Sequence, residues 1–306
     1  MPELPEVETV RRGLEPHVVG RRLERVRIFD PRLTRPFPPD DVAAALEGER
    51  VAELDRRGKY LIFRFESGRV LLIHLRMTGG LRHALAVSPA RENHRRAVLS
   101  LDNGADVIYR DARRFGTWLL LEPGELRPYL ASRLGAEPFA RSFTAERLGD
   151  RLAGRRTSVK AALLDQRSLA GLGNIYVDEA LWRARIHPLR PAGEVTSAEA
   201  RRLHRSIRHA LRLGIARQGS TLSDYRTADG TRGSMQDEFK VYGREGEPCF
   251  RCRTPIERTR AGGRGTSYCP SCQPLDGEEE EAPRTRSRKR VTSARDRNTT
   301  TSRPSS

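Results

Sequence analysis

The stretch KAALLDQRSLAGLGNIYVDEALW, residues 160–182, contains two helical segments joined by a tight turn that is rich in glycine. Gly171 and Gly173 come just before Asn174, where the second segment begins. This spacing predicts a helix–turn–helix arrangement in outline. Helix N-termini bind phosphate well, and Asn174 could both cap the helix and donate to a phosphate. Taken alone, a plain helical hairpin is the simpler interpretation, and Lys160 could be an ordinary surface lysine.

Strand patterns precede this stretch and helical patterns surround it. Residues 23–125 contain short apolar or β-branched runs separated by turn signals: VRIF, VAEL, YLIFRF, VLLIHL, AVLSL and DVIYR. Ser-Gly at 67–68 and Asn-Gly at 103–104 are typical of hairpin turns. These features predict antiparallel strands in a sandwich or a barrel. Residues 5–14 predict a leading helix, and residues 144–217 follow a helical pattern.

Composition changes mark the remaining segments. Residues 127–140 are expected to link the strands to the helices. Residues 219–238 are polar and punctuated by glycine, which predicts a mobile loop. From residue 274 the chain has low complexity, with an EEEE run before an arginine-rich run, which predicts disorder.

Positive charge dominates the composition. The chain has 57 Lys and Arg against 40 Asp and Glu, a formal net charge of +17. Codon usage in a GC-rich genome would explain the preference for arginine but not the imbalance in sign. We therefore expect nucleic acid as the partner. No apolar run is long enough to span a membrane, and the first residues lack the apolar core of a signal peptide, so we expect a cytoplasmic protein.

The four cysteines form two Cys-x-x-Cys pairs, CFRC at 249–252 and CPSC at 269–272. Such pairs can converge on one tetrahedral zinc, and the alternative is a pair of redox dithiols. Their clustering and the glycine-rich hairpin between them favour a metal in a reducing compartment. One structural Zn²⁺ is expected, because no coordination position would stay open. Its ligands would be Cys249, Cys252, Cys269 and Cys272.

Two further motifs place a bulky apolar residue beside cations and just before glycine. They are HLRMTGG at 74–80, with Met77, and DARRFGTW at 111–118, with Phe115. Apolar wedges beside arginine are what a protein needs to enter a base stack. Met77 and Phe115 could equally be core residues, so the pattern alone leaves both interpretations open.

The N-terminus, MPELPEVETV, is only partly explained by helix formation. Pro5 suits the first position of a helix, and Glu6 and Glu8 complement the positive end of its dipole. Neither argument accounts for a proline at position 2.

These motifs occur together in one known family. The chain contains, in order, MPELPEVET, RRGKY, HLRMTG, DARRFG, LLDQRSLAGLGNIYVDEALW, VYGREGEPC and RGTSYCPSCQ. In this it closely resembles the bacterial formamidopyrimidine-DNA glycosylases, which repair oxidised purines. The resemblance implies an α+β fold, in which an N-terminal antiparallel β-sandwich with a leading helix precedes a helical domain. That helical domain would contain a helix-two-turn-helix motif and a four-cysteine zinc finger. The expected parts are a catalytic sandwich domain, a helical DNA-binding domain with the lesion loop, a zinc-finger module and a disordered tail, at residues 1–130, 131–238, 239–273 and 274–306.

The resemblance also implies a mechanism. Met1 is removed, so Pro2 becomes the terminal residue, and an α-amino pKa of about 8 leaves part of it nucleophilic. Its attack on the sugar C1′ gives a Schiff base, expels the damaged base and leads to β,δ-elimination at the abasic site. Glu3 would be the general acid/base and Glu6 would hold a water. Lys59 and Arg264 complete the catalytic set.

Damaged double-stranded DNA is the partner that the resemblance implies, bound by a bacterial, cytoplasmic, nucleoid-associated protein that we expect to be a monomer. Lys59 and Arg264 would grip phosphates. The side chains that fill the space left by the flipped base would include an arginine that pairs with the orphaned cytosine. Further contacts are expected from His74, Met77, Arg113, Phe115, Lys160 and Asn174, of which Lys160 has the weakest support.

The chain departs from the family pattern at three places. Ala112 stands where proline is frequent, Arg253 follows the second cysteine where glycine is usual, and the lesion loop is similar only in outline. One alternative is an endonuclease VIII-type glycosylase for oxidised pyrimidines, and another is a catalytically silent zinc-finger DNA-binding protein. The MPELPE terminus favours the purine enzyme. Retention of Pro2, Glu3 and Lys59 argues against the silent protein.

Overall fold

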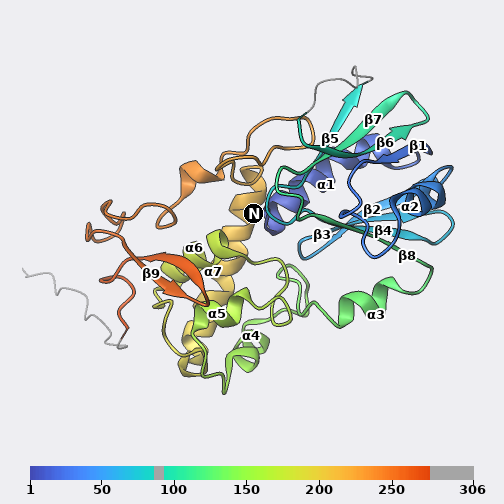
Figure 1. Cartoon of the computed structure of the whole chain (residues 1–306). Coiled ribbons are helices and arrows are strands. Elements are labelled where there is room, and N and C mark those ends of the chain that lie inside the picture. Colours follow the sequence, from blue (N-terminus) through green and yellow to red (C-terminus); the bar gives the residue numbers. More distant parts are fainter. Residues whose placement is uncertain (86–92, 276–306) are drawn as a thin grey trace, which may run out of the picture. The chain divides into compact units, whose positions relative to one another are not determined.

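Two four-stranded antiparallel sheets fill most of residues 23–121 in the computed structural model, which describes residues 1–85 and 93–275 (Figure 1). One sheet has the order β1–β6–β7–β5, with bounds Leu23–Ile28, Arg95–Leu101, Ala105–Arg110 and Gly80–Leu85. The other has the order β2–β3–β4–β8, with bounds Val51–Arg57, Tyr60–Phe65, Val70–His74 and Thr117–Leu121. Both predicted hairpin turns join paired strands, β3 to β4 and β6 to β7. From position 276 onward, the expected disordered tail lies outside the described residues.

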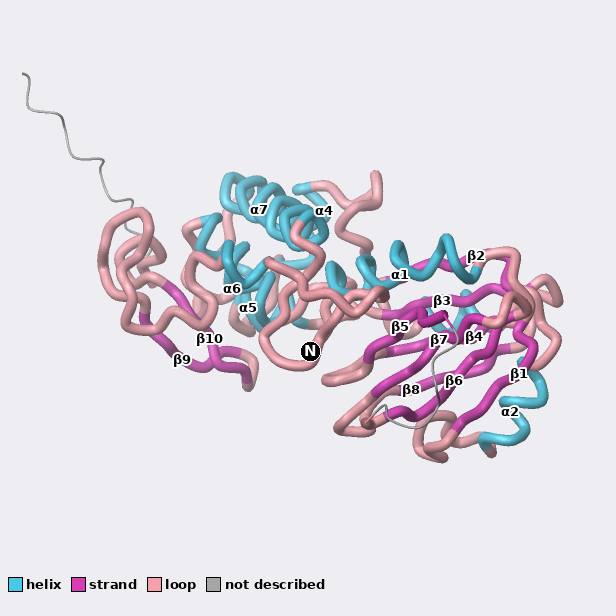
Figure 2. Tube along the Cα trace, turned by 90° about the horizontal axis from the view of Figure 1, so that it is seen from above, coloured by secondary structure: helices cyan, strands magenta, loops and turns pink. Residues whose placement is uncertain are grey.

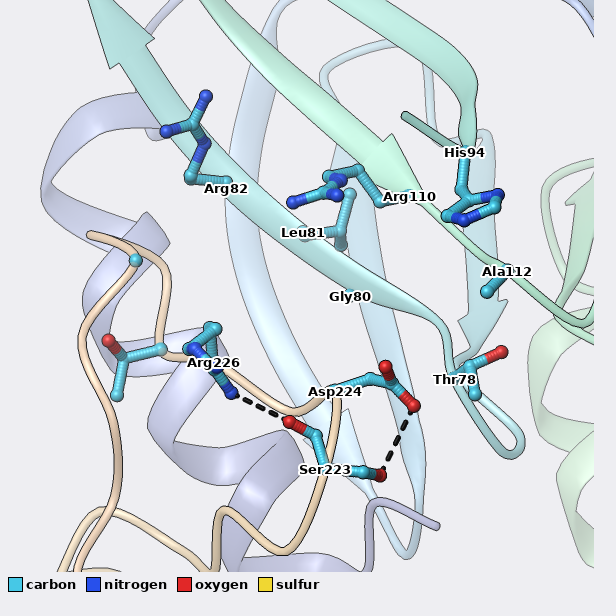
Figure 3. A pocket seen from close by; sticks show the side chains of 12 residues that line it. Thr78, Gly80, Leu81, Arg82, His94, Arg110, Ala112, Ser223, Asp224 and Arg226 are labelled. Carbon is cyan, nitrogen blue, oxygen red and sulfur yellow. Dashed lines mark hydrogen bonds between the residues drawn. The ribbon is translucent and has the colours of Figure 1, made fainter. Parts of the chain in front are cut away.

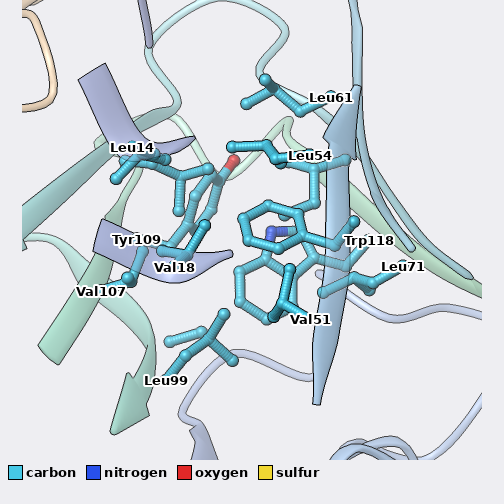
Figure 4. Packing of buried hydrophobic residues seen from close by; sticks show 14 of the residues in the cluster. Leu14, Val18, Val51, Leu54, Leu61, Leu71, Leu99, Val107, Tyr109 and Trp118 are labelled. Carbon is cyan, nitrogen blue, oxygen red and sulfur yellow. The ribbon is translucent and has the colours of Figure 1, made fainter. Parts of the chain in front are cut away.

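The core of this sandwich lies between the two sheets. Figure 4 shows the rings of Tyr109 from β7 and Trp118 from β8 in it, with centroids 5.4 Å apart and planes inclined at 63°. Such an edge-on aromatic pair contributes about 0.5–1.5 kcal/mol beyond area burial. Leu14 and Val18 of α1 (Leu4–Val18) belong to the same apolar cluster, as do side chains of α2 (Pro39–Leu46). The leading helix is therefore fixed to the sandwich by its apolar face.

A short helix covers the outer face of the second sheet. All residues of β4 are buried, because its side chains face the sandwich core on one side and α3 (Leu126–Ala131) on the other. Leu126, Tyr129 and Leu130 of α3 provide this cover. The segment that we expected to be a linker, residues 127–140, thus begins in a helix that packs on the sheet.

Four helices form the second part of the chain: α4 (Ala145–Leu152), α5 (Val159–Leu164), α6 (Asn174–Ala184) and α7 (Ser197–Ala216). Hydroxyl groups that accept a backbone N–H cap three of them, at Thr144, Ser158 and Thr196. The helices α6 and α7 approach closely because Gly214 faces the ring of Tyr176. A Cβ atom at position 214 would lie 2.4 Å from that ring.

The N-terminal turn joins the two parts. Leu4 belongs to the apolar core of the helices, whereas Val7 belongs to the core of the sandwich. The N–H of Leu4 donates to the Gly171 carbonyl at 3.0 Å. Gly171 has a φ of +91°, and a Cβ there would also collide with the Leu4 side chain. Figures 1 and 2 both place the N-terminus between the sheets and the helices.

A two-stranded hairpin lies between the cysteine pairs. Its strands are β9 (Glu257–Ala261) and β10 (Arg264–Tyr268). The small core of this module contains Trp182 of α6 together with Val241, Cys249, Ile256 and Cys269. The C-terminal end of α6 therefore carries the cysteine module. Within the described ranges, every helix is too short or too polar to cross a membrane.

Candidate active site

Pro2 lies buried at the junction of the two parts, beside a small cavity. The other walls of this cavity come from the β4–β5 turn, the start of α6 and the segment after α7 (residues 217–238). Tertiary structure thus brings three distant segments to the chain terminus. Their lining residues include Met77, Ile175, Ser220 and Tyr225.

Glu3 caps the N-terminus of α6. Its carboxylate oxygens accept the N–H groups of Ile175 at 3.0 Å and Tyr176 at 3.4 Å, an arrangement that the helix dipole favours. Burial raises the pKa of Glu3, while the nearby ammonium of Lys59 lowers it. Gly173 permits this approach, because a Cβ there would lie 2.3 Å from the Glu3 carboxyl carbon. A buried carboxyl whose pKa is raised holds its proton more readily than an exposed one, which suits a general acid.

Glu6 connects the N-terminal turn to two other segments. Its carboxylate accepts the N–H of Glu3 at 2.8 Å, the hydroxyl of Tyr176 at 2.7 Å and the N–H of Ser220 at 2.8 Å. Three protein donors from separate segments therefore occupy the group that was expected to hold a water. In this structure the hydrogen bonds of Glu6 connect α1, α6 and the segment after α7.

Two cations follow one another outward from Glu3: Lys59 acts electrostatically on Glu3, and Arg264 acts on Lys59. Lys59, in the β2–β3 turn, is 5% exposed, and burial lowers the pKa of its ammonium. The charges of Glu3 and Glu6 raise that pKa, and the charge of Arg264 lowers it. Arg264 is exposed at the start of β10. The fold thus brings the predicted catalytic residues together from three separate elements.

Lys160 has a different place from the DNA contact that was expected. Its side chain is fully buried, and its ammonium lies 2.6 Å from Asp178 Oδ1 and 3.1 Å from the Gly265 carbonyl oxygen. A cation enclosed in this way does not reach a phosphate while the pair is intact. Asn174 Nδ2 donates to the same carbonyl at 3.0 Å, and Asp178 accepts the N–H of Ser267 at 3.1 Å. These contacts position the hairpin that carries Arg264.

His74, the last residue of β4, is neutral at pH 7. Burial, together with the charges of Arg76 and Lys59, lowers its pKa to about 3. Its Nδ1 accepts the N–H of Arg76 at 3.0 Å, and its ring stands edge-on to Tyr60. In the neutral ring Nε2 then carries the proton. His74 therefore offers a hydrogen-bond donor rather than a positive charge.

The three predicted wedge residues stand on two adjacent turns. Phe115 is 52% exposed, and the guanidinium carbon of Arg113 lies 4.8 Å from the centre of its ring. Met77 is half-buried on the neighbouring turn. Thr78, which the motif analysis did not single out, connects the turns because its Oγ1 accepts the N–H of Arg113 at 3.0 Å. Phe115 belongs to none of the described apolar cores, so the core interpretation does not hold for it.

The segment after α7, which was expected to be mobile, has fixed contacts in this structure. Ala228 packs into the sandwich core, and its carbonyl accepts the N–H of His83 in β5 at 2.9 Å. A cavity of about 330 Å³ remains between this segment and strands β5 and β7 (Figure 3). Arg82 and Arg110 line it from the strands and Arg226 lines it from the segment. Thr78 and Ala112 also line the cavity, so it lies beside the two turns that carry Met77, Arg113 and Phe115.

The four cysteines meet at one point. Their Sγ atoms all lie within 4.8 Å of one another, and three of the pairs are 3.4, 3.5 and 3.9 Å apart. A tetrahedral zinc with 2.3 Å Zn–S bonds needs sulfur atoms about 3.8 Å apart, so the set fits one structural ion. Arg253, where glycine is usual, has a φ of +66°. It thus keeps the left-handed turn that glycine adopts at lower cost.

Comparison with known proteins agrees with this arrangement. Residues 1–118 match the family model of the formamidopyrimidine-DNA glycosylase N-terminal domain, residues 134–226 match that of its H2TH domain, and residues 246–275 match a zinc finger found in FPG and IleRS. The formamidopyrimidine-DNA glycosylase of Symbiobacterium thermophilum is 51% identical over 276 residues, which cover 90% of either chain. That of Roseiflexus sp. is 46% identical over 274 residues, which cover 89% of this chain and 100% of the relative.

Solved structures have the same fold. A Lactococcus lactis FPG variant in complex with Fapy-dG-containing DNA has a TM-score of 0.84 and 39% identity, over 89% of this chain and 100% of that chain. The MutM (FPG) protein of Thermus thermophilus has a TM-score of 0.79 and 46% identity, over 89% of this chain and 98% of that chain. The chain belongs to the formamidopyrimidine-DNA glycosylase family, and it is a DNA-repair glycosylase that acts on damaged DNA and has a structural zinc site.

Proposed function

We propose that the protein excises oxidised purines, 8-oxoguanine and formamidopyrimidines, from duplex DNA and then cleaves the abasic site by β,δ-elimination. The position of Pro2 carries this proposal, because it lies at the junction beside Glu3 and lines the cavity with Met77 and Ile175. Fapy-dG-containing DNA is the partner of the Lactococcus lactis FPG variant, which supports this choice of lesion.

The chemistry follows from a free secondary amine at Pro2, which requires removal of Met1. The nitrogen attacks C1′, and the bond from C1′ to the base breaks, so the base leaves with the bonding electrons. The attacking nitrogen loses its proton, Glu3 protonates the ring oxygen, and the C1′–O4′ bond opens to give an iminium. Loss of a proton from C2′ then expels the 3′ phosphate, and loss of a proton from C4′ expels the 5′ phosphate. Hydrolysis of the iminium frees the amine.

We assign the phosphate contacts to residues that surround Glu3. Lys59 and Arg264 would bind the phosphates that flank the flipped nucleotide, because Lys59 lies close enough to Glu3 to shift its pKa and Arg264 lies close enough to Lys59 to do the same. His74 would donate a hydrogen bond from Nε2. Asn174 begins α6, and its contact with Gly265 ties that end of the helix to the hairpin.

The turns that carry Met77, Arg113 and Phe115 would fill the gap in the duplex. Flipping a nucleotide costs a few kcal/mol of stacking, and an exposed ring can recover part of it. Phe115 is suited to this role because it is exposed and Arg113 stands over its face. Arg113 would then meet the orphaned cytosine.

Borohydride trapping tests the proposed nucleophile. The protein would be mixed with a duplex bearing 8-oxoguanine opposite cytosine, reduced, digested and examined by peptide mass spectrometry. The expected result is a DNA adduct on a peptide that begins with Pro2. An adduct on an internal lysine would contradict the assignment.

Variants of the two N-terminal prolines provide the control. Pro2→Gly should still bind the duplex but lose most of its cleavage, whereas Pro5→Ala, which changes only the start of α1, should cleave as the wild type does. The intact mass of each preparation would first be measured by mass spectrometry to show that Met1 is absent. Cleavage by Pro2→Gly at the wild-type rate would refute the covalent mechanism.

A further inference from the structure

A second cationic surface lies on the helical part of the protein. A groove of about 650 Å³ follows α7, passes the C-terminal end of α6 and reaches the first cysteine pair. Among the residues described, its lining consists of six arginines, two histidines and one serine, with no acidic or aliphatic side chain. We call it the α7 groove, and its arginines are Arg183, Arg202, Arg205, Arg208, Arg212 and Arg251.

The α7 groove is separate from the active site. Asn174 begins α6 beside the hairpin, whereas Arg183 lies in the last turn of the same helix. These positions are about 14 Å apart along the helix axis, at 1.5 Å per residue. On α7, Arg205 and Arg212 are exposed, while Leu203 and Ile207 on another side of the helix are buried in the core that includes residues of α6. The groove therefore occupies a different surface from the one that holds Glu3 and Arg264.

The positive charges of the groove have little internal compensation. Arg202 has a weak ion pair with Glu199 at 3.7 Å. No carboxylate of residues 1–85 or 93–275 forms an ion pair with Arg183, Arg205 or Arg212. Burial, with the charges of Arg183 and Arg212, lowers the pKa of His209 in the same groove. The side chains thus repel further positive charge, and an anionic ligand would relieve this repulsion.

The zinc module holds one of these arginines in place. The guanidinium of Arg251 lies 3.8 Å from the centre of the Trp182 ring and donates to the Trp182 carbonyl at 2.7 Å. Because this side chain is already ordered, little conformational entropy is lost when it binds an anion. The groove therefore has one preformed end.

The lining distinguishes between classes of polyanion. A protein partner would need apolar or aromatic anchors at the centre of its interface, and the described lining contains none. Guanidinium groups match the geometry of phosphate and can bind it with two hydrogen bonds. Arg202 to Arg212 extends about 15 Å along α7, which corresponds to about four phosphates of one DNA strand. These features favour the DNA backbone.

We propose that the α7 groove binds the phosphate backbone of a second DNA duplex while the active site holds the damaged one. One protein molecule then bridges two duplex segments. Release from one segment leaves the other bound, which speeds transfer between segments during a search for damage. This function rests on DNA binding alone and is independent of the lesion and of the covalent mechanism proposed above.

The test measures binding of a second duplex by the full chain. The active site is first filled with an unlabelled duplex that contains a tetrahydrofuran abasic analogue. A fluorescent undamaged duplex is then added, and its anisotropy is followed over a range of salt concentrations. We expect the logarithm of the binding constant to fall with the logarithm of the salt concentration with a slope of about −3.6, since each of about four phosphates contributes about −0.9.

A pair of matched variants locates the second site. Arg183→Gln/Arg205→Gln/Arg212→Gln should weaken the second duplex by about tenfold or more and flatten the salt slope, with the first duplex bound as before. The control removes the same charge from three exposed arginines elsewhere, Arg25, Arg127 and Arg156, and should retain the second duplex. Thermal unfolding should be unchanged in both variants, because the substituted side chains are exposed.

Three outcomes would overturn the proposal. The filled wild type could fail to bind the labelled duplex even at low salt, or both triple variants could weaken it equally, which would indicate a general effect of net charge. Tighter binding of polyglutamate than of the duplex would assign the groove to an acidic protein instead. Loss of the second duplex in the groove variant alone would support the proposal.

Discussion

At the scale of single residues, burial sets the protonation of the active site. Glu3, Lys59 and His74 are each at most 8% exposed, and burial favours the neutral form of all three. It raises the pKa of Glu3 and lowers the pKa of Lys59 and of His74. The shifts of Glu3 and Lys59 are each partly offset by the other residue, because their opposite charges stabilise both ionised forms. His74 has only cations among the charged neighbours that shift its pKa, so no opposite charge offsets the effect of burial.

His74→Gln is expected to make the fold less sensitive to acid. His74 titrates near 6.5 in the unfolded chain and near 3 in the fold, so between these values the unfolded state binds more protons. The stability that depends on neutral His74 is present above pH 6.5 and is lost as the pH falls. From the unfolded pKa of 6.5, the loss at pH 5 is about 2 kcal/mol.

Urea unfolding at pH 7 and pH 5 would measure this difference. The wild type should lose about 2 kcal/mol more than His74→Gln between the two conditions. His94→Asn is the matched control, since His94 is exposed and has a positive φ that asparagine tolerates. Equal losses in the wild type and in His74→Gln would show that the folded protein protonates His74.

At the scale of secondary-structure elements, the buried Lys160–Asp178 pair sets the position of the β9–β10 hairpin. Lys160 lies in α5, Asp178 lies in α6, and both also contact the backbone of β10. Asn174 adds a third contact to β10. The exposed Arg264 therefore stands on a strand whose neighbouring residues are held by two helices.

Asp178→Asn is expected to destabilise the protein by about 3 kcal/mol, because it leaves the Lys160 ammonium buried without a counter-charge. Adding Lys160→Met should recover part of the loss, since that change removes the stranded charge. Denaturant unfolding of the two single variants and the double variant gives the coupling energy. Strictly additive losses would show that the two side chains do not support each other.

Removal of zinc should unfold the cysteine module while the sandwich stays folded. The module has only a small apolar core, so the metal supplies much of its folding free energy. Of the two tryptophans, Trp118 lies in the sandwich and Trp182 donates to Cys249 Sγ at 3.4 Å. Chelation of zinc from a Trp118→Phe variant should therefore shift the remaining fluorescence to longer wavelength and abolish DNA binding.

The matched Trp182→Phe variant should show no such shift on chelation. A shift of equal size in both variants would mean that the sandwich unfolds together with the module. Zinc content would be measured by elemental analysis before and after chelation.

At the scale of the whole molecule, an ionic network joins the leading helix, the sheets and the helices. Arg56 of β2 lies between Glu8 of α1, at 3.1 Å, and Glu137 of the connection to the helices, at 3.2 Å. Arg57 also pairs with Glu137, at 2.9 Å. These side chains are largely buried, so their pairing is screened less by salt than a surface pair. The network connects α1 and β2 to the segment that leads into the helices.

Glu137→Gln is expected to lower the free energy of unfolding by about 2 kcal/mol, because Arg57 loses its carboxylate partner and Arg56 keeps only Glu8. Glu53→Gln is the control, since Glu53 pairs with Arg64 at an exposed site where the expected loss is below about 1 kcal/mol. Thermal unfolding would compare the two variants. Equal changes in the melting temperature would contradict the importance of the network.

Local sequence patterns predicted much of the fold. The runs at β3, β4, β6 and β7 are short and apolar or β-branched, and glycine marks the β3–β4 and β6–β7 turns, so the strands could be recognised without knowledge of their partners. Strands β5 and β8 and helix α2 were not recognised individually. Their segments, GLRHAL, TWLLL and PDDVAAAL, are short and carry weak periodicity, so tertiary packing rather than local preference determines them.

The sequence by itself determined the zinc ligands, the main helices and strands, and the family, because these depend on spacings within short segments. Only the tertiary structure decided that Lys160 is buried against Asp178 and that Glu6 accepts hydrogen bonds from three segments. It also decided that Phe115 is exposed and that His74 is neutral. Each of these properties arises where segments far apart in the chain exclude water from one another. Burial and charge at such a junction depend on what packs against a side chain, and neither periodicity nor motif spacing specifies that.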